Sequence, residues 1–182
     1  AVVMPTYARV PIELVTGDGC RVTDATGREY LDFASGIAVS TLGHRHPVVV
    51  EAMHRAAEGM LHVSNLYWTA PMVRLAERLT AAAGMDAAFF CNSGTEAVEA
   101  ALKLARRARP GRHVFITFEG SFHGRTLGAL SVTAQPKYQQ PFAPLVPEVR
   151  VLPVDDVTAL EAVDGSVAAV IVEPIQGEGG GR

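Results

Sequence analysis

The spacing of hydrophobic and polar residues changes twice along this chain. Residues 11–33 alternate in short stretches, PIELV, CRVTD and REYLDF, separated by turns that contain glycine. Glycine reaches the positive φ of tight turns, so this part predicts a small antiparallel meander of three strands. An irregular connection is expected to follow as far as Pro47.

Helical spacing begins at Pro47. Apolar positions recur every three or four residues over 47–60 and 69–83. Thr69 is a candidate N-cap of the second segment, and Gly84 is a candidate stop. Both segments are therefore predicted to be amphipathic helices.

From residue 87 onward, short apolar stretches alternate with helical ones, which predicts an α/β fold with a mostly parallel sheet covered by helices. A short helical or loop stretch is expected near 124–131, and the four prolines of 132–148 predict largely non-helical chain there. The remaining elements are expected to be strands at 87–91, 113–118, 149–153 and 167–172, and helices at 94–109 and 156–163.

Composition narrows the class of protein. The chain has 182 residues, 48% of them hydrophobic, and a formal net charge of −3. That length allows a sizeable core, and the charge argues against nucleic acid or a membrane surface as a partner. No apolar run approaches the roughly 20 residues of a membrane span, and the first residues lack the pattern of a secretory signal. Two cysteines are too few for a disulfide framework, so a reducing, cytoplasmic location is expected.

The strongest local signal is Ser93-Gly94-Thr95, which follows a predicted strand and opens a long predicted helix. Unpaired backbone N–H groups and the helix dipole suit such a position to a phosphate.

The same segment also has an ordinary structural explanation. Ser93 and Glu96 have the spacing of a capping box, and Glu99 and Lys103 have that of an i,i+4 ion pair. From this segment alone, both interpretations stay open.

A second signal, residues 119–126, follows the next predicted strand. In a parallel sheet it lies at the same carboxyl edge as Ser93, where ligands of open α/β sheets bind. Phe122 could stack on a planar ligand, and Arg125 could hold a carboxylate with two hydrogen bonds. A core phenylalanine and a solvated loop charge are the alternatives.

A third signal, residues 171–180, also follows a predicted strand. Glu173 and Glu178 bracket a Pro-Ile-Gln-Gly turn. Their carboxylates could orient a cationic group or restrain an arginine, or the segment could be a solvated loop.

Other kinds of site find little support. His44 and His46 have no cysteine, histidine or carboxylate cluster that would complete a metal site, so no metal is expected. The chain also lacks the glycine-rich nucleotide motifs and the G-x-S-x-G motif of serine hydrolases.

Taken together, five segments resemble the class III pyridoxal-phosphate aminotransferases. The resemblance runs in order from about residue 7 to the end of the chain. The segments are YLDFASGIAVSTLGHRHP (30–47), SNLYWTAP (64–71), FFCNSGTEAVEAALKLAR (89–106), FEGSFHGRTLGALSVTAQPKY (118–138) and VIVEPIQGEGG (170–180).

The resemblance implies roles around a pyridoxal 5'-phosphate cofactor. Gly94 and Thr95, with Ser93 beside them, would hold the phosphate. Phe122 would stack on the pyridine ring, with His123 close by.

It also implies a substrate site. Arg125 would bind a substrate carboxylate, and Glu173 would lie near the ring-nitrogen side of the pocket. Glu178 would act as a gate, pairing with an arginine elsewhere until 2-oxoglutarate or glutamate needs that arginine.

The fold and activity implied are those of the fold type I pyridoxal-phosphate enzymes. Residues 1–46 would belong to the small domain, and residues 47–182 to the first part of the large cofactor-binding domain. The reaction would move the terminal amino group of N-acetylornithine to 2-oxoglutarate, in arginine biosynthesis and in a homodimer. Ile37 stands where ornithine aminotransferases carry a tyrosine, which argues mildly against free ornithine. Succinylornithine, 4-aminobutyrate and carrier-linked lysine remain alternative donors.

The family's Schiff-base lysine is not expected among these residues. Only Lys103 and Lys137 are present, and neither lies in the family's lysine motif. The chain therefore resembles the N-terminal half of such an enzyme, and a truncated, non-catalytic anion-binding protein is the alternative from another class.

Overall fold

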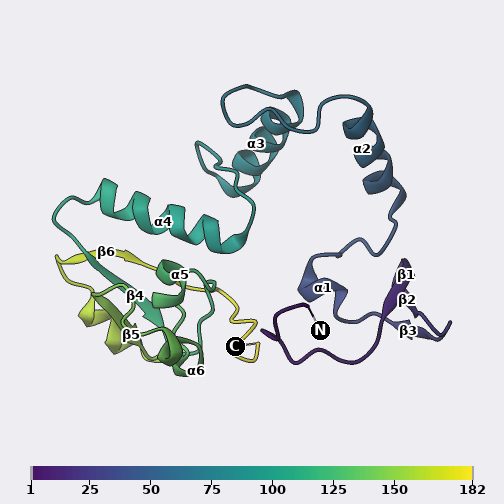
Figure 1. Ribbon diagram of the computed structural model, residues 1–182. Helices are drawn as coiled ribbons and strands as arrows, with labels where there is room; N and C mark the ends of the chain where they lie inside the picture. The colour runs from purple at the N-terminus through teal and green to yellow at the C-terminus, as the bar shows by residue number, and fades with distance from the viewer. Residues whose placement is uncertain (1, 182) are drawn as a thin grey trace. The chain divides into compact units, whose positions relative to one another are not determined.

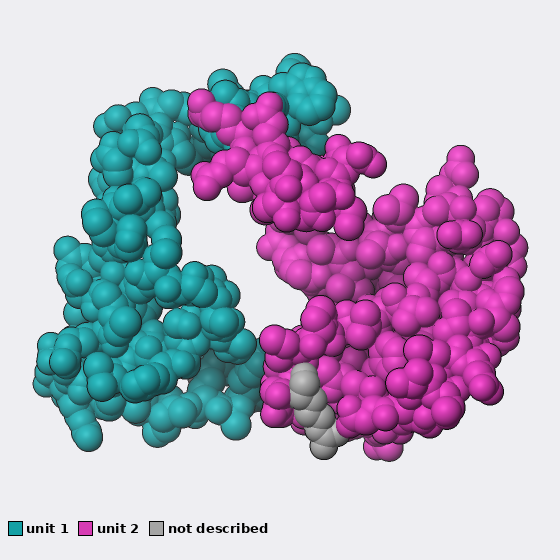
Figure 2. Space-filling model, turned by 180° about the vertical axis from the view of Figure 1, so that it is seen from behind, with its two compact units in different colours: residues 1–73 teal, residues 74–182 magenta. Residues whose placement is uncertain are grey.

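The computed structural model describes residues 2–181. The chain divides into two compact units, residues 1–73 and residues 74–182 (Figure 2). The domain boundary expected at residue 46 concerns the complete enzyme fold and stays a prediction. No helix in the described range is long and apolar enough to cross a membrane.

The first unit contains the predicted meander. Strands β1 (Leu14–Asp18), β2 (Arg21–Asp24) and β3 (Glu29–Leu31) form an antiparallel sheet in the order β1-β2-β3. The meander expected over residues 11–33 is confirmed.

Asp24 closes the turn between β2 and β3. Its buried carboxylate accepts hydrogen bonds from the backbone N–H and hydroxyl of Thr26, the backbone N–H of Arg28 and the hydroxyl of Tyr30. These donors, the Thr26 hydroxyl first, stabilise the charged form and lower the pKa of Asp24 from 3.8 to about 2. The turn is therefore held by an ionised carboxylate.

The helices after the meander begin and end close to the predicted positions. A short turn, α1 (Ser35–Ala38), has positive φ at all four residues and interrupts the irregular connection. Helices α2 (Pro47–Glu58) and α3 (Ala70–Ala83) follow, and neither contains a buried residue. Their apolar faces therefore lie open in the described part of the chain.

The second unit is the predicted α/β layer. Its three strands are parallel, in the order β5-β4-β6 (Figure 1). The elements are α4 (Gly94–Ala108), β4 (Val114–Phe118), α5 (Leu127–Ser131), α6 (Pro136–Gln139), η1 (Gln140–Phe142), β5 (Val149–Leu152), η2 (Val157–Ala162) and β6 (Val167–Val170). The sheet direction and class agree with the sequence pattern.

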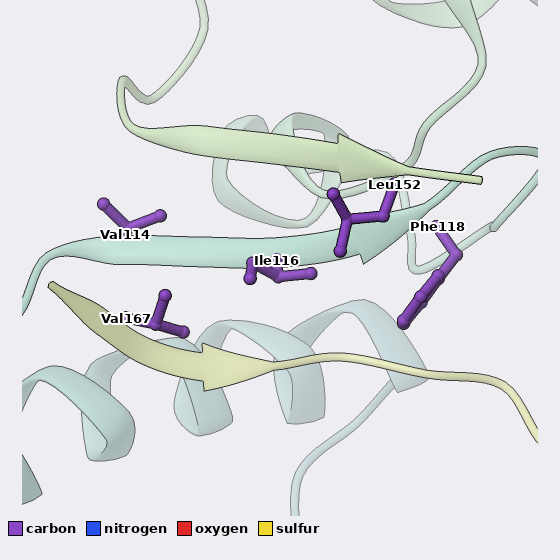
Figure 3. Close-up of a cluster of buried hydrophobic side chains, with 5 residues drawn as sticks. All are labelled: Val114, Ile116, Phe118, Leu152 and Val167. Carbon is purple, nitrogen blue, oxygen red and sulfur yellow. The ribbon is translucent and has the colours of Figure 1, made fainter. Parts of the chain in front are cut away.

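The central strand β4 is buried along its whole length and separates two apolar clusters. On one face, Ile116 packs with side chains of β5 and β6 (Figure 3). Residues of η2 cover this cluster. On the other face, Phe115 packs with Leu102 of α4 and with Val132. The sheet thus has helical segments on both faces, with its carboxyl edge left for loops.

One local prediction was wrong. Residues 87–91 form no strand, because no described strand lies alongside to complete a ladder, and Phe89 is 67% exposed. The proline-rich stretch 132–148 is largely non-helical, as predicted, and its helical part is limited to the short helices α6 and η1. Pro136 and Pro141 lie in their first turns, where the missing N–H costs nothing.

Candidate functional site

The loop after β4 contacts the start of α4. The hydroxyl oxygens of Thr95 and Thr126 lie 2.9 Å apart, and the backbone N–H of Thr126 donates to the Thr95 hydroxyl over 3.4 Å. Two segments 31 residues apart in the chain, both expected at the carboxyl edge of the sheet, therefore meet there.

Two glycines allow this close approach. A Cβ on Gly124 would lie 2.7 Å from the Cβ of Thr95, and the φ of Gly124 is +132°. A Cβ on Gly128 would lie 2.7 Å from a carboxylate oxygen of Glu99. Real Cβ atoms do not approach other atoms so closely, so position 124 needs glycine, and a side chain at position 128 would displace the Glu99 carboxylate.

Glu99 joins α4 to the start of α5. Its Oε1 accepts the hydroxyl of Thr126 over 2.5 Å and the backbone N–H groups of Gly128 and Ala129 over 3.0 and 3.1 Å. The i,i+4 pairing of Glu99 with Lys103 was therefore a wrong expectation. The first N–H groups of α5, which have no partner within that helix, attract the carboxylate instead.

The capping box at the start of α4 is confirmed. The Ser93 hydroxyl donates to Glu96 Oε2 over 2.7 Å and accepts the Glu96 backbone N–H over 3.3 Å. Hydrogen bonds from Ser93 and then Asn92 lower the pKa of Glu96. The capping role does not exclude an anion, because the space next to Gly94 is open and the first N–H groups of a helix lack partners within it.

Phe122 and His123 are fixed by their backbones. The N–H of Phe122 donates to Glu173 Oε2 over 3.0 Å, and the N–H of His123 donates to the buried Thr133 hydroxyl over 2.9 Å. Burial lowers the pKa of His123, although the negative charge of Glu173 opposes the shift. The buried Nε2 of His123 has no hydrogen-bond partner in the described structure. A neutral imidazole with an unsatisfied atom lies beside the predicted ring-binding phenylalanine.

Arg125 and Glu178 belong to one cluster, built around a residue that the sequence did not single out. The guanidinium of Arg125 lies 4.7 Å from the ring centroid of Tyr138 and 5.6 Å from that of Phe122. The hydroxyl of Tyr138 donates to Glu178 Oε1 over 2.8 Å. The second and third sequence signals therefore meet, and Tyr138 connects them.

Gln176 fastens the loop of residues 171–180 to the loop of residues 119–126. Its side chain is 3% exposed, and its amide donates to the carbonyl of Glu119 over 3.0 Å. A Cβ on Gly120 would lie 3.1 Å from its Oε1, so the two loops pack tightly. The sequence shows Gln176 within a Pro-Ile-Gln-Gly turn. The burial of its side chain depends on the tertiary structure and could not be predicted from the sequence.

The structure thus brings together Phe122, Arg125, Glu173 and Glu178 through direct contacts and shared neighbours. Thr95 joins the same edge through Thr126. No group of three potential metal ligands occurs among residues 2–181.

A parallel sheet with a helix N-terminus, a phenyl ring and an arginine at its carboxyl edge is typical of the ligand-binding sites of α/β proteins. The sequence profile of the family "Aminotransferase class-III" matches residues 2–182. The chain belongs to this family.

Curated relatives are similar over almost the whole chain. It is 54% identical to the acetylornithine aminotransferase of Methanopyrus kandleri, covering 98% of this chain and 46% of that protein. It is 53% identical to the acetylornithine aminotransferase of Mycolicibacterium smegmatis, covering 99% and 46%. The chain spans about half the length of the curated relatives it matches.

Solved structures agree on the fold. The ornithine aminotransferase of Toxoplasma gondii superposes with a TM-score of 0.91 at 35% identity, covering 98% of this chain and 44% of that one. The N-acetylornithine aminotransferase of Stenotrophomonas maltophilia gives 0.76 at 40% identity, covering 96% and 44%. The second unit and the meander thus share the fold of the type I pyridoxal-phosphate transaminases.

Pyridoxal 5'-phosphate is the cofactor of this family, and an amine transaminase with a TM-score of 0.84 is described in its PLP-bound form. The residues of this chain fit such a group. The open space at Gly94 suits a phosphate, and the half-buried ring of Phe122 suits a planar heterocycle. The buried Nε2 of His123, which has no hydrogen-bond partner in the described structure, fits a polar atom of such a group.

Proposed function

We propose that these residues form the cofactor-binding and donor-binding part of an aminotransferase that acts on N-acetylornithine and 2-oxoglutarate. The observation that carries the proposal is the cluster of Phe122, Arg125, Tyr138 and Glu178 at the carboxyl edge of the sheet. The curated relatives at 54% and 53% identity, both acetylornithine aminotransferases, support the choice of donor.

Gly94 and Thr95 would hold the cofactor phosphate at the N-terminus of α4. The contact between Thr95 and Thr126 fixes the hydroxyl at this position. Phe122 would pack against the pyridine ring, and the hydrogen bond from its N–H to Glu173 sets the position of its backbone. When bound, pyridoxal phosphate supplies an electron sink that stabilises negative charge on the substrate carbon.

Arg125 would bind the α-carboxylate of the donor. A guanidinium presents paired N–H groups along its edge, while its face remains suited to aromatic rings. The guanidinium carbon of Arg125 lies over both rings, 5.6 Å from the centroid of Phe122 and 4.7 Å from that of Tyr138. Carboxylate binding and aromatic packing can therefore occur together, and they would orient the donor's terminal amine toward the ring.

Glu178 would serve as the gate between the two half-reactions, and Glu173 would lie toward the ring nitrogen. The carboxylate of Glu178 accepts the hydroxyl of Tyr138. Because Glu178 is exposed, this carboxylate can exchange that partner for another. Such exchange would let one site accept first a donor with one carboxylate and then a dicarboxylate.

Amino transfer also requires a lysine that links to the cofactor and moves a proton. Lys103 lies within α4, and the ammonium of Lys137 lies 4.6 Å from the ring centroid of Tyr138. We propose that neither performs this step and that the lysine comes from outside these 182 residues. A cytoplasmic homodimer in arginine biosynthesis is part of the same proposal.

The test uses the complete protein that contains this sequence. Glutamate formation from N-acetylornithine and 2-oxoglutarate is measured, with succinylornithine, ornithine, 4-aminobutyrate and a carrier-linked lysine as competing donors. The expected result is the highest kcat/KM for N-acetylornithine. Arg125→Ala should lower this value by at least about tenfold through KM, because one charge-assisted pair is lost.

Two outcomes contradict the proposal. A higher kcat/KM for another donor would replace N-acetylornithine while keeping the enzyme class. Binding of pyridoxal phosphate to the pure protein is monitored by the visible absorption of the cofactor. If no binding is detected, the non-catalytic anion-binding alternative is favoured.

A further inference from the structure

Tyr138 makes four contacts within the candidate site. Its ring lies against the guanidinium of Arg125 at 4.7 Å and the ammonium of Lys137 at 4.6 Å. It also meets the ring of Phe122 edge-on, with centroids 6.0 Å apart and planes at 80°. Its hydroxyl donates to Glu178 over 2.8 Å. One half-buried side chain therefore contacts the proposed groups for cofactor, donor and gate.

Two glutamines fix the position of the short helix that carries Tyr138. The amide of Gln135 donates to the carbonyls of Gly120 and Ser121 over 3.2 and 3.3 Å. The amide of Gln139 donates to the carbonyls of Leu130 and Ser131, at the end of α5. Because α6 is attached on both sides, its tyrosine has a defined position beside the loop.

The two ends of Tyr138 act on groups of opposite charge. A cation over an aromatic face is attracted to the ring, which limits the orientations of Arg125. A hydroxyl that donates to a carboxylate holds the negative charge of Glu178 in place. Without the hydroxyl, the exposed carboxylate of Glu178 would be free to turn toward the guanidinium of Arg125, which contacts the same tyrosine and is the proposed partner of the substrate carboxylate.

We propose that Tyr138 is a positioning residue of the donor site, whose ring orients Arg125 and whose hydroxyl restrains Glu178 from competing with substrate carboxylates. This inference rests on the proposed function, which assigns Arg125 and Glu178 their roles. The proposed function names Tyr138 only as a neighbour of Arg125 and Glu178 and gives it no role of its own.

The experiment separates the ring from the hydroxyl in the complete holoenzyme. Tyr138→Leu removes both, and Tyr138→Phe removes only the hydroxyl. KM and kcat are measured for N-acetylornithine. The dissociation constant of glutarate, a non-reacting dicarboxylate, is measured from the change in cofactor absorbance.

Tyr138→Leu should raise the KM for N-acetylornithine about 5- to 10-fold with kcat within about twofold, because Arg125 loses its aromatic support. Tyr138→Phe should raise this KM less. It should weaken glutarate binding about 3- to 10-fold, because Glu178 is released. Adding Glu178→Gln to Tyr138→Phe should restore glutarate binding, whereas adding it to Tyr138→Leu should leave the higher KM for N-acetylornithine.

Tyr30→Phe is the matched control. This substitution also removes a tyrosine hydroxyl that donates to a carboxylate, because Tyr30 donates to Asp24 over 2.7 Å. Tyr30 lies in the meander and has no role in the candidate site. The kinetic constants of this variant should equal those of the unmodified enzyme.

Equal effects of Tyr138→Leu and Tyr138→Phe, or no recovery on adding Glu178→Gln, would overturn the inference. If Tyr138→Leu does not fold, glutarate binding by Tyr138→Phe, compared with that of Tyr138→Phe combined with Glu178→Gln, still tests the inference. Unchanged donor KM in Arg125→Ala would instead defeat the proposed function. A raised KM in Arg125→Ala with normal constants in Tyr138→Leu would defeat the inference alone.

Discussion

At the scale of single residues, Gly124 determines how closely the loop after β4 approaches α4. Its φ of +132° and the Thr95 Cβ, 2.7 Å from where its own Cβ would lie, leave no place for a side chain. The position of the Thr95 hydroxyl, and hence the proposed phosphate site, depends on this glycine.

Gly124→Ala should lower the free energy of unfolding by about 1–3 kcal/mol, because the backbone conformation is strained for any residue with a Cβ. It should also weaken pyridoxal phosphate binding, because Thr95 must move. Urea denaturation and cofactor titration measure the two effects. The control is Gly165→Ala, where the added Cβ would have no atom within 4 Å. Equal stability of the two variants would show that the loop can relax.

The limits of sequence-based prediction are also clearest at single residues. Phe122, Arg125 and Glu178 were predicted to lie together because the carboxyl ends of parallel strands share an edge. Tyr138 was missed because its contacts with Arg125 and Glu178 join segments 13 and 40 residues away, and no local spacing encodes them. Glu99 was assigned to a neighbour on its own helix, since the start of α5 is distant in sequence.

At the scale of elements, Glu99 connects α4 with α5. Glu99→Ala should lower the free energy of unfolding by about 1–3 kcal/mol, because a hydroxyl and two N–H groups lose their acceptor. Lys103→Ala is the control and should change it by less than about 0.5 kcal/mol, as for an ordinary surface substitution. An equal decrease in the free energy of unfolding in both variants would instead support the Glu99–Lys103 ion pair that the sequence suggested. Urea unfolding of both proteins measures the difference.

The meander is expected to lose stability in acid. The pKa of Asp24 is about 2 in the folded state, below its ordinary 3.8, because four hydrogen bonds favour its charged form. Its contribution is therefore complete above about pH 4 and is lost as the pH falls toward about 2. NMR titration of the Asp24 carboxyl carbon should give a midpoint near 2. A midpoint near 3.8 would contradict this prediction, and Asp24→Asn should remove this part of the acid sensitivity.

Elements with strong local periodicity were predicted well, whereas those that depend on a neighbour were not. Helix α4 and strand β4 follow their predicted ranges within one residue. Residues 87–91 have the composition of a strand, but a strand also needs a partner beside it, and the described sheet ends at β5 and β6. Composition cannot supply that partner.

At the scale of the whole molecule, residues 1–182 expose more surface than folded domains of their size. The accessible surface is 13823 Å². Two independent globular domains with the sizes of the two units would expose about 10,200 Å² in total. Large apolar side chains account for part of the excess, among them Val172 and Ile175 just beyond β6, which are 59% and 73% exposed.

A polypeptide of residues 1–182 should therefore self-associate when it is produced alone. Light scattering coupled to size-exclusion chromatography should show a mass that increases with concentration, because exposed apolar surface and the open edge of β6 favour association. The complete protein, measured in parallel, should give a mass independent of concentration. A strictly monomeric polypeptide of residues 1–182 would contradict the prediction.

The contacts of the loop between β4 and α5 also matter for changing the donor of this scaffold. The loop is anchored at its far end twice, by Thr126 on Thr95 and by Gly128 on Glu99. An inserted or deleted residue would break both anchors at once, whereas a replacement at the exposed Arg125 would leave them intact. Libraries designed for new donors should therefore vary the identity of residue 125 and keep the length of the loop constant.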